Sequence, residues 1–98
     1  MTDEERALHR YAQALSLVEA KGKLITIGVT TFKEYKTATL TVRFMPTRNR
    51  LDVWDRRKVL TVDRLYGSLK VITYTRGAWE DELEEAASPA TDDPPDRT

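Results

Sequence analysis

Hydrophobic residues recur at helical spacing over the first twenty positions of the chain. The repeat has steps of three and four residues and runs through Leu8, Tyr11, Ala12, Leu15 and Val18. Thr2 and Glu5 stand ahead of it at the spacing of a capping box, and Gly22 follows where a left-handed cap would end a helix. We therefore expect a helix over about residues 3–21. Leu17 falls on the opposite side of that helix, either as an exposed leucine or as part of a second contact surface.

Alternation of apolar and polar residues replaces the helical repeat after Gly22. The apolar positions of the first alternating stretch are Ile25, Ile27 and Val29. KEYK (33–36) reads as a polar connection to the next stretch, TATLTVRFM (37–45), which has the clearest alternation in the chain. The apolar members of that stretch are Ala38, Leu40, Val42 and Phe44. These patterns predict two strands, each with one buried and one wet face.

A second group of strand patterns follows PTRN (46–49), where Pro46 cannot extend a central strand. RLDVW (50–54) places Leu51 and Val53 on one face, and Arg50, Asp52 and Trp54 on the other. KVLTVDRLY (58–66) has two interpretations. Its β-branched residues favour a strand, but Asp55 could also cap a short helix over the same residues. We favour the strand, and LKVITYT (69–75) predicts a further one.

The C-terminal part of the chain contains a helical pattern followed by a polar segment without one. GAWEDELEEAA predicts a short helix over about residues 78–87, because Trp79, Leu83 and Ala86 share one face. SPATDDPPDRT (88–98) is acidic and rich in proline and has no large apolar residue, which is typical of a disordered tail.

The predicted fold is one α+β domain over residues 1–87. An N-terminal helix precedes an antiparallel β-meander of three to five strands, and a short C-terminal helix helps to cover the apolar face of the sheet. A disordered acidic tail follows at 88–98. The expected core consists of Leu8, Leu15, Ile25, Ile27, Leu40, Val42, Phe44, Val53 and Trp79.

The zero net charge of the chain conceals an uneven distribution. Residues 21–76 contain thirteen Lys and Arg against four Asp and Glu, a net charge of +9. Residues 1–20 carry −2 and residues 77–98 carry −7. A basic segment of this kind favours acidic partners such as nucleic acid, and we expect the acidic C-terminal residues to compete with such a partner.

The residues that usually carry catalysis are scarce. The chain has no cysteine, and its single histidine, His9, lies on the flank of the first apolar stripe. We therefore expect no nucleophile–base pair, no metal site, no cofactor and no enzymatic activity. The polar N-terminus and the lack of a long apolar run predict a cytoplasmic protein with no membrane partner.

Cationic residues cluster on both sides of Trp54. Alternate connections of a meander lie at the same end of the sheet, so we expect the connections at 33–36 and 55–57 to meet there. Trp54 itself is either exposed on the wet face or covered by a helix or a partner. The predicted nucleic-acid-binding residues are Lys33, Tyr35, Lys36, Arg43, Arg48, Arg50, Trp54, Arg56, Arg57 and Lys58.

Cations beside an aromatic ring favour single-stranded RNA or DNA, because phosphates meet the charges and bases stack on the ring. We therefore predict a small non-catalytic protein that binds nucleic acid through a basic sheet face. The alternative is a protein–protein interaction role, as an adaptor, a regulator or a chaperone-like homodimer. Phe32, Met45 and Trp54 among arginines match the composition of protein interfaces, which supports this alternative.

Overall fold

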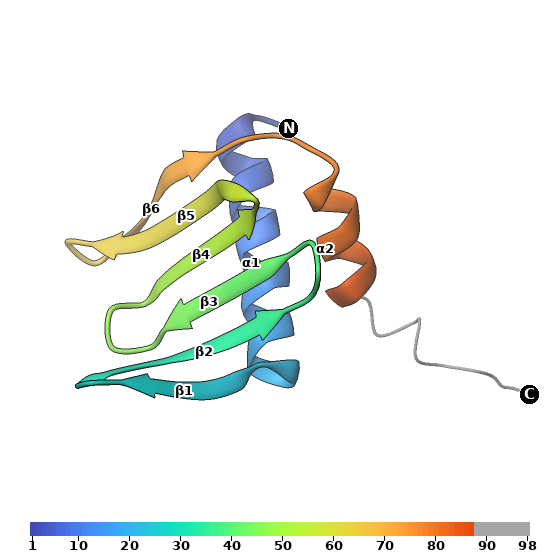
Figure 1. The fold of residues 1–98 in the computed structure, drawn as a ribbon. Helices are drawn as coiled ribbons and strands as arrows, with labels where there is room; N and C mark the ends of the chain where they lie inside the picture. The colour runs from blue at the N-terminus through green and yellow to red at the C-terminus, as the bar shows by residue number, and fades with distance from the viewer. Residues whose placement is uncertain (88–98) are drawn as a thin grey trace, which may run out of the picture.

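The computed structural model describes residues 1–87, which form two helices and one six-stranded sheet (Figure 1). The helices are α1 (Asp3–Lys21) and α2 (Trp79–Ala87). The strands are β1 (Lys23–Ile27), β2 (Thr30–Lys36), β3 (Thr41–Met45), β4 (Arg50–Asp55), β5 (Arg57–Leu65) and β6 (Ser68–Tyr74). The α+β class and the antiparallel meander between two helices are confirmed, although the sheet has more strands than expected. The tail predicted at 88–98 lies outside the described residues.

The first helix begins as predicted and ends differently. The Thr2 hydroxyl accepts a hydrogen bond of 3.1 Å from the Glu5 amide, and the Glu5 carboxylate accepts one of 2.8 Å from the Thr2 amide, which confirms the capping box. Gly22 has an extended backbone with φ of −78°, so the predicted left-handed cap is wrong. Glycine is required there for a steric reason. A Cβ on Gly22 would overlap the Val18 carbonyl oxygen and lie 2.8 Å from Val18 Cγ2.

The strands follow one another across the sheet in sequence order, and every neighbouring pair is antiparallel. Gly28 and Val29 form the turn between β1 and β2, where Gly28 has φ of +63°. The predicted connection at 33–36 is therefore wrong, because those residues lie inside β2 and residues 37–40 connect it to β3. Val29 concealed the turn, since it continues the apolar series although its side chain is fully exposed.

Residues 58–66 form most of β5 and its turn, so the strand interpretation of this stretch is confirmed. Tyr66 and Gly67 connect β5 to β6 with φ values of 52° and 80°. Two consecutive residues with positive φ are typical of the tight hairpin turn that matches the twist of its strands.

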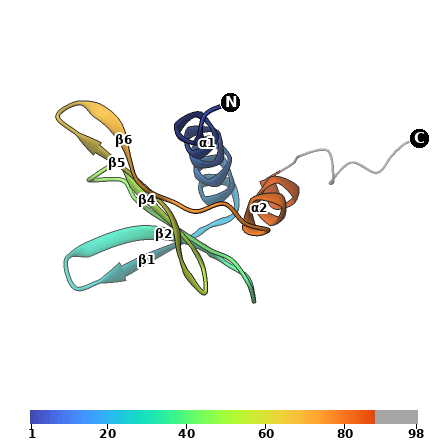
Figure 2. The same cartoon turned by 90° about the horizontal axis from the view of Figure 1, so that it is seen from above.

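Both helices lie on the same side of the sheet, and the main core lies between the two layers (Figure 2). Most of the predicted strand core is confirmed, since Leu40, Val42, Phe44 and Val53 are buried there together with Trp79. Leu8 and Leu15 are only partly buried at its margin. Within residues 1–87, neither helix combines the length and apolar character needed to cross a membrane.

Two core predictions need correction, and one of the two alternatives for Leu17 is confirmed. Ile25 and Ile27 lie on β1 at the edge of the sheet, where Ile25 is partly exposed and Ile27 is 65% exposed. Leu17 is buried rather than exposed, so it belongs to a second contact surface of α1. The helix contacts both the sheet and α2, and its buried stripe is accordingly Ala7, Ala14, Leu17 and Val18.

A buried carboxylate joins α2 to the rest of the protein. Glu80 accepts hydrogen bonds from Tyr74 Oη at 2.7 Å, Arg10 Nε at 3.1 Å and the Gly77 amide at 3.3 Å, and Arg6 lies within 3.4 Å. Burial alone would raise the pKa of Glu80, but the hydrogen bonds and the arginine charge outweigh it, so this pKa lies below its ordinary value. The network is therefore anchored by a charged carboxylate at neutral pH.

Candidate nucleic-acid interface

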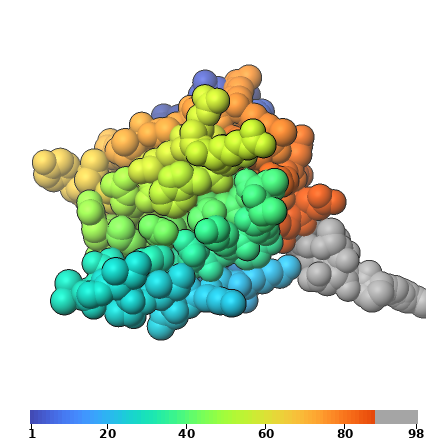
Figure 3. Space-filling view, in the orientation of Figure 1, coloured from blue at the N-terminus to red at the C-terminus, as the bar shows by residue number. Residues whose placement is uncertain are grey.

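The sheet has a second face, directed away from the helices, which we call the open face. In Figure 3, which looks onto it, the strands span the surface and α1 is visible only at the margins. Strand register places on this face Phe32, Glu34, Lys36, Thr41, Arg43, Met45, Arg50, Asp52, Trp54, Thr61 and Asp63. The outward direction of Arg43, Arg50 and Trp54 is confirmed.

Arg43 lies at the centre of the open face between two aromatic rings. Its guanidinium carbon is 4.4 Å from the centre of the Phe32 ring and 5.3 Å from that of the Trp54 ring. Its Nη2 also donates a hydrogen bond of 2.9 Å to Glu34. Phe32 is only 4% exposed although it lies outside the main core, because the arginine side chain covers it.

Buried acids neutralise much of the charge on this face. Asp52 stands in register between Arg43 on β3 and Thr61 on β5, and it is 5% exposed. Its carboxylate accepts hydrogen bonds of 2.7 Å from Thr61 Oγ1 and 3.1 Å from Arg50 Nε, and Lys58 Nζ lies 3.6 Å away. These partners compensate the cost of burying the carboxylate.

Asp63 is a second buried acid that neutralises arginines, nearer the β3–β4 turn. Its carboxylate lies 3.4 Å from Arg48 Nη2 and 3.5 Å from Arg50 Nη1. The hydrogen bond to Asp52 is the largest cause that raises the pKa of Arg50 above its ordinary value. Several predicted binding cations therefore have acidic partners inside the protein: Arg43, Arg48, Arg50 and Lys58.

One end of the sheet keeps cations without acidic partners. Register aligns Lys36, Thr41, Trp54 and Lys58 on the open face across β2 to β5. Arg56 forms the adjacent β4–β5 turn, and Arg57 begins β5 opposite Asp55, so alternation directs Arg57 to the helix side. We call Lys36, Trp54, Arg56, Arg57 and Lys58 the basic corner. Within residues 1–87, Lys36, Arg56 and Arg57 are exposed and form no ion pair.

Two features of the basic corner bear on binding. Trp54 is half-buried, and Lys58 Nζ lies 5.5 Å from the centre of its ring, so the tryptophan is neither fully exposed nor covered by a helix. Arg56 has φ of +67°, which is uncommon for a residue with a side chain. Asn49 and Tyr66 have the same conformation in their own hairpin turns, so it follows from the turn.

Two of the predicted binding residues lie elsewhere. Lys33 and Tyr35 are in register with Phe44 and Val42, which places them on the helix-covered face, and Tyr35 packs against the core. We expected residues 33–36 to lie beside the turn at 55–57. Of these residues, only Lys36, at the end of β2, lies at that end of the open face. The prediction failed because side chains of a strand alternate between faces, whereas those of a connection do not.

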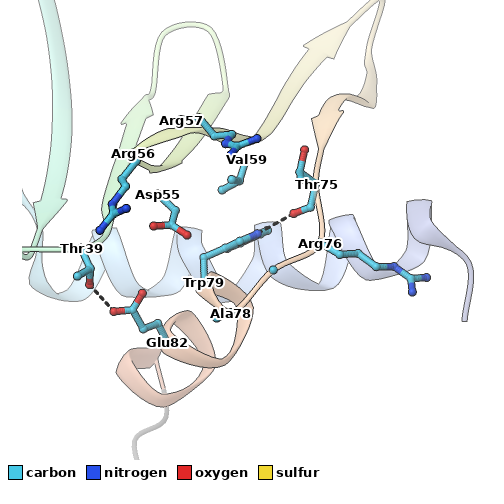
Figure 4. A pocket seen from close by; sticks show the side chains of 11 residues that line it. Thr39, Asp55, Arg56, Arg57, Val59, Thr75, Arg76, Ala78, Trp79 and Glu82 are labelled. Atoms are coloured by element: carbon cyan, nitrogen blue, oxygen red, sulfur yellow. Dashed lines mark hydrogen bonds between the residues drawn. The ribbon is translucent and has the colours of Figure 1, made fainter.

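A pocket of about 490 Å³ lies between the basic corner and the start of α2 (Figure 4). Arg56 and Arg57 line its β4–β5 side, and Trp79 lies across from them. Asp55 and Glu82 add negative charge to the same lining. Its volume is in the range of small-molecule sites, but the mixed charge indicates no particular class of ligand.

Sequence reasoning missed the acidic partners of the arginines, although a signal was available. The connection at 46–49 joins two strands of a hairpin, and antiparallel pairing about it sets Arg43 opposite Asp52. Opposite charges at facing positions stabilise a strand pair, so this register predicts acids among the arginines. In the structure, Arg43 forms its ion pair with Glu34 on its other side, and Asp52 pairs with Arg50 and Lys58.

Among residues 1–87, no three His, Asp or Glu side chains gather into a group that could hold a metal ion. Comparison of the chain with models of protein families, with curated proteins and with solved structures finds no match, so the geometry of the chain itself carries the functional argument.

Proposed function

We propose that this protein is a small non-catalytic binding protein that binds single-stranded RNA or DNA through the basic corner. The observation that carries the proposal is the position of Lys36, Arg56 and Arg57. These three cations have no ion pair within residues 1–87 and lie at the same end of the sheet as the half-buried Trp54. Lys36 is on the open face, Arg56 is in the β4–β5 turn, and Arg57 is directed to the helix side.

The residues of the corner have different roles in this proposal. Lys36, Arg56 and Arg57 contact phosphates, because their charges are not committed to acids of the protein. Trp54 offers a ring to a base after Lys58 moves aside, since that ammonium is held over the ring only by a 3.6 Å contact with Asp52 and by the ring itself. Arg43 stays in place against Glu34 and keeps the ring oriented.

The proposal is tested by fluorescence anisotropy with a labelled single-stranded oligonucleotide over a series of salt concentrations. The double variant Arg56→Ala/Arg57→Ala is expected to bind more weakly and to lose about one to two units of the log–log salt slope. Arg64→Ala/Lys70→Ala is the matched control, because it removes the same charge from exposed positions on β5 and β6. It is expected to retain the slope of the wild type.

The same titration distinguishes stacking from charge. Trp54→Ala is expected to lose about 1–3 kcal/mol of binding free energy, whereas Trp54→Phe retains most of it. Absence of binding by the wild type at low salt would end the proposal. Equal losses in the two double variants would show that binding follows total charge rather than the basic corner.

A second candidate function is binding of a protein partner on the open face, as an adaptor, a regulator or a chaperone-like homodimer. The observation in its favour is that Arg43 is ion-paired between Phe32 and Trp54, and that Arg50 is ion-paired on the same face. Such a surface has the arginine and aromatic content of a protein interface without a large excess of charge. Binding of this kind would depend only weakly on salt, unlike binding of phosphates.

A further inference from the structure

Among residues 1–87, the strand β1 is an outer edge of the sheet, with no strand beyond it (Figure 1). It has apolar residues on both faces. Leu24 is in register with Lys33 on the helix side and is 66% exposed, because α1 packs mainly on β2 to β6. Ile25 and Ile27 lie on the open side, where Ile27 is also largely exposed. An edge strand of this kind presents unpaired backbone amides and carbonyls beside apolar side chains.

The opposite edge of the sheet is protected against pairing, and β1 is not. In β6 the register shifts around Ile72, which has no partner on β5, and Lys70 adds an exposed charge. Bulges and lysines are devices by which edge strands avoid pairing with other chains. The pairing of β1 with β2 has no register shift, and the single charge of β1, Lys23, stands opposite Glu34.

We propose that two copies of this chain associate through β1, with the two strands antiparallel about a two-fold axis at Ile25. This register uses the whole five-residue strand. It sets Ile25 against Ile25 of the second copy, Leu24 against Thr26, and Lys23 against Ile27. The two sheets become one continuous sheet, and the free backbone groups of β1 are paired.

A second copy suits this edge better than a charged peptide. On the open side, Phe32 is the neighbour of Ile25 within one chain, so the two-fold axis creates an apolar row of four side chains across the interface. The two Lys23 residues lie at opposite ends of the paired strands, where each already faces Glu34 of its own chain. No like charges meet directly in this register.

The pairing is expected to be concentration-dependent, because a five-residue edge covers less area than the roughly 1,600 Å² of a standard stable interface. It does not rest on either proposed function. The basic corner lies on β2, β4 and β5, and β1 contributes none of its residues, so a dimer through β1 leaves the corner accessible.

Disulfide cross-linking tests both the interface and its register, since the chain has no cysteine of its own. Facing residues of antiparallel strands have Cα atoms about 4.5–5.5 Å apart, within the range of a disulfide. Ile25→Cys is therefore expected to give a covalent dimer under mild oxidation. Leu24→Cys, whose counterpart faces Thr26 instead, and Ile72→Cys on the opposite edge are expected to react several-fold more slowly. Equal yields for the three variants would overturn the proposal.

Two variants of opposite charge at Ile27 test the proposed dimer independently. Their dimerisation is measured by sedimentation equilibrium over a concentration series. Ile27→Lys places a cation opposite Lys23 of the second copy, twice across the axis, whereas Ile27→Glu places an anion there. The lysine variant is expected to dimerise about tenfold more weakly than the glutamate variant. A wild type that stays monomeric at every concentration would refute the interface, as would equal dissociation constants for the two variants. Oligonucleotide binding by both variants, measured in parallel, reports separately on the basic corner.

Discussion

Tyr74 donates a hydrogen bond of 2.7 Å to Glu80 at the junction between the last strand and α2. The same carboxylate is bonded to Arg10 of α1, so one buried charge connects the sheet and both helices. Burial is the largest cause that raises the pKa of Tyr74 above its ordinary value, and the phenol therefore remains a donor at neutral pH. This junction sets the position of α2.

Removal of the buried carboxylate is expected to destabilise the protein strongly. Within residues 1–87, Glu80→Ala leaves Arg10 with a largely buried guanidinium and only the exposed Glu84 as an acidic partner. Breaking a buried ion pair in this way costs about 3–5 kcal/mol. Urea unfolding followed by circular dichroism measures the loss. Glu85→Ala, on the exposed side of α2, is the control and should stay within about 0.5 kcal/mol of the wild type.

The contribution of Glu80 should depend on pH with a defined sign. Its pKa is lower in the folded protein than in the unfolded chain, where a glutamate titrates near about 4.3. As the pH falls below that value the unfolded chain takes up the proton first, so the contribution is complete above the unfolded pKa and is lost through the folded pKa. The stability difference between the wild type and Glu80→Gln should therefore shrink as the pH is lowered through this window. A constant difference would contradict the assignment.

Two residues predicted as core differ in their structural position, and truncation should separate them. Leu40 is 3% exposed in the core, so Leu40→Ala is expected to cost about 2–5 kcal/mol. Ile27 lies on the exposed edge strand, and Ile27→Ala should cost less than about 0.5 kcal/mol in dilute solution. Equal shifts of the urea midpoint would mean that β1 is covered.

Glycine substitutions should distinguish a steric requirement from a conformational one. Gly22→Ala forces a Cβ against the Val18 carbonyl, although its φ of −78° suits alanine. Gly67→Ala meets no neighbouring atom, but its φ of +80° costs about 1–2 kcal/mol with a side chain. Thermal unfolding should show the larger loss for Gly22→Ala, because the last turn of α1 or the start of β1 has to move.

Arg43 is expected to act mainly on stability rather than on ligand binding. Arg43→Ala uncovers Phe32 and removes a cation from two rings, at a cost of about 1–2 kcal/mol. Arg48→Ala removes an equal charge from a more exposed ion pair and should cost less than about 1 kcal/mol. Urea midpoints of the two variants measure the contrast, and identical values would assign Arg43 an ordinary surface role.

Much of the fold follows from local patterns in the sequence. The capping box of Thr2 and Glu5 places the start of α1, since its hydrogen bonds join residues only three positions apart. The alternation around Val42 and Phe44 identifies the buried face of β3, because side chains of a strand point to opposite sides with a period of two. The outward direction of Trp54 follows from the same rule.

Only the tertiary structure decided which of these faces is covered and which charges are free. Ile27 has the same alternating pattern as Val42, but its register with Thr30 places it on the open face, which neither helix covers. Arg56 follows Asp55 in the sequence and Arg43 has no acid nearby in the sequence, yet only Arg43 stands opposite acids of neighbouring strands and forms an ion pair. Whether a helix covers a side chain, and whether an acid neutralises an arginine, depends on which strands and helices meet in the folded chain. That pairing is set by turns such as Gly28–Val29 and by the packing of α1 and α2, because these contacts join residues far apart in the chain.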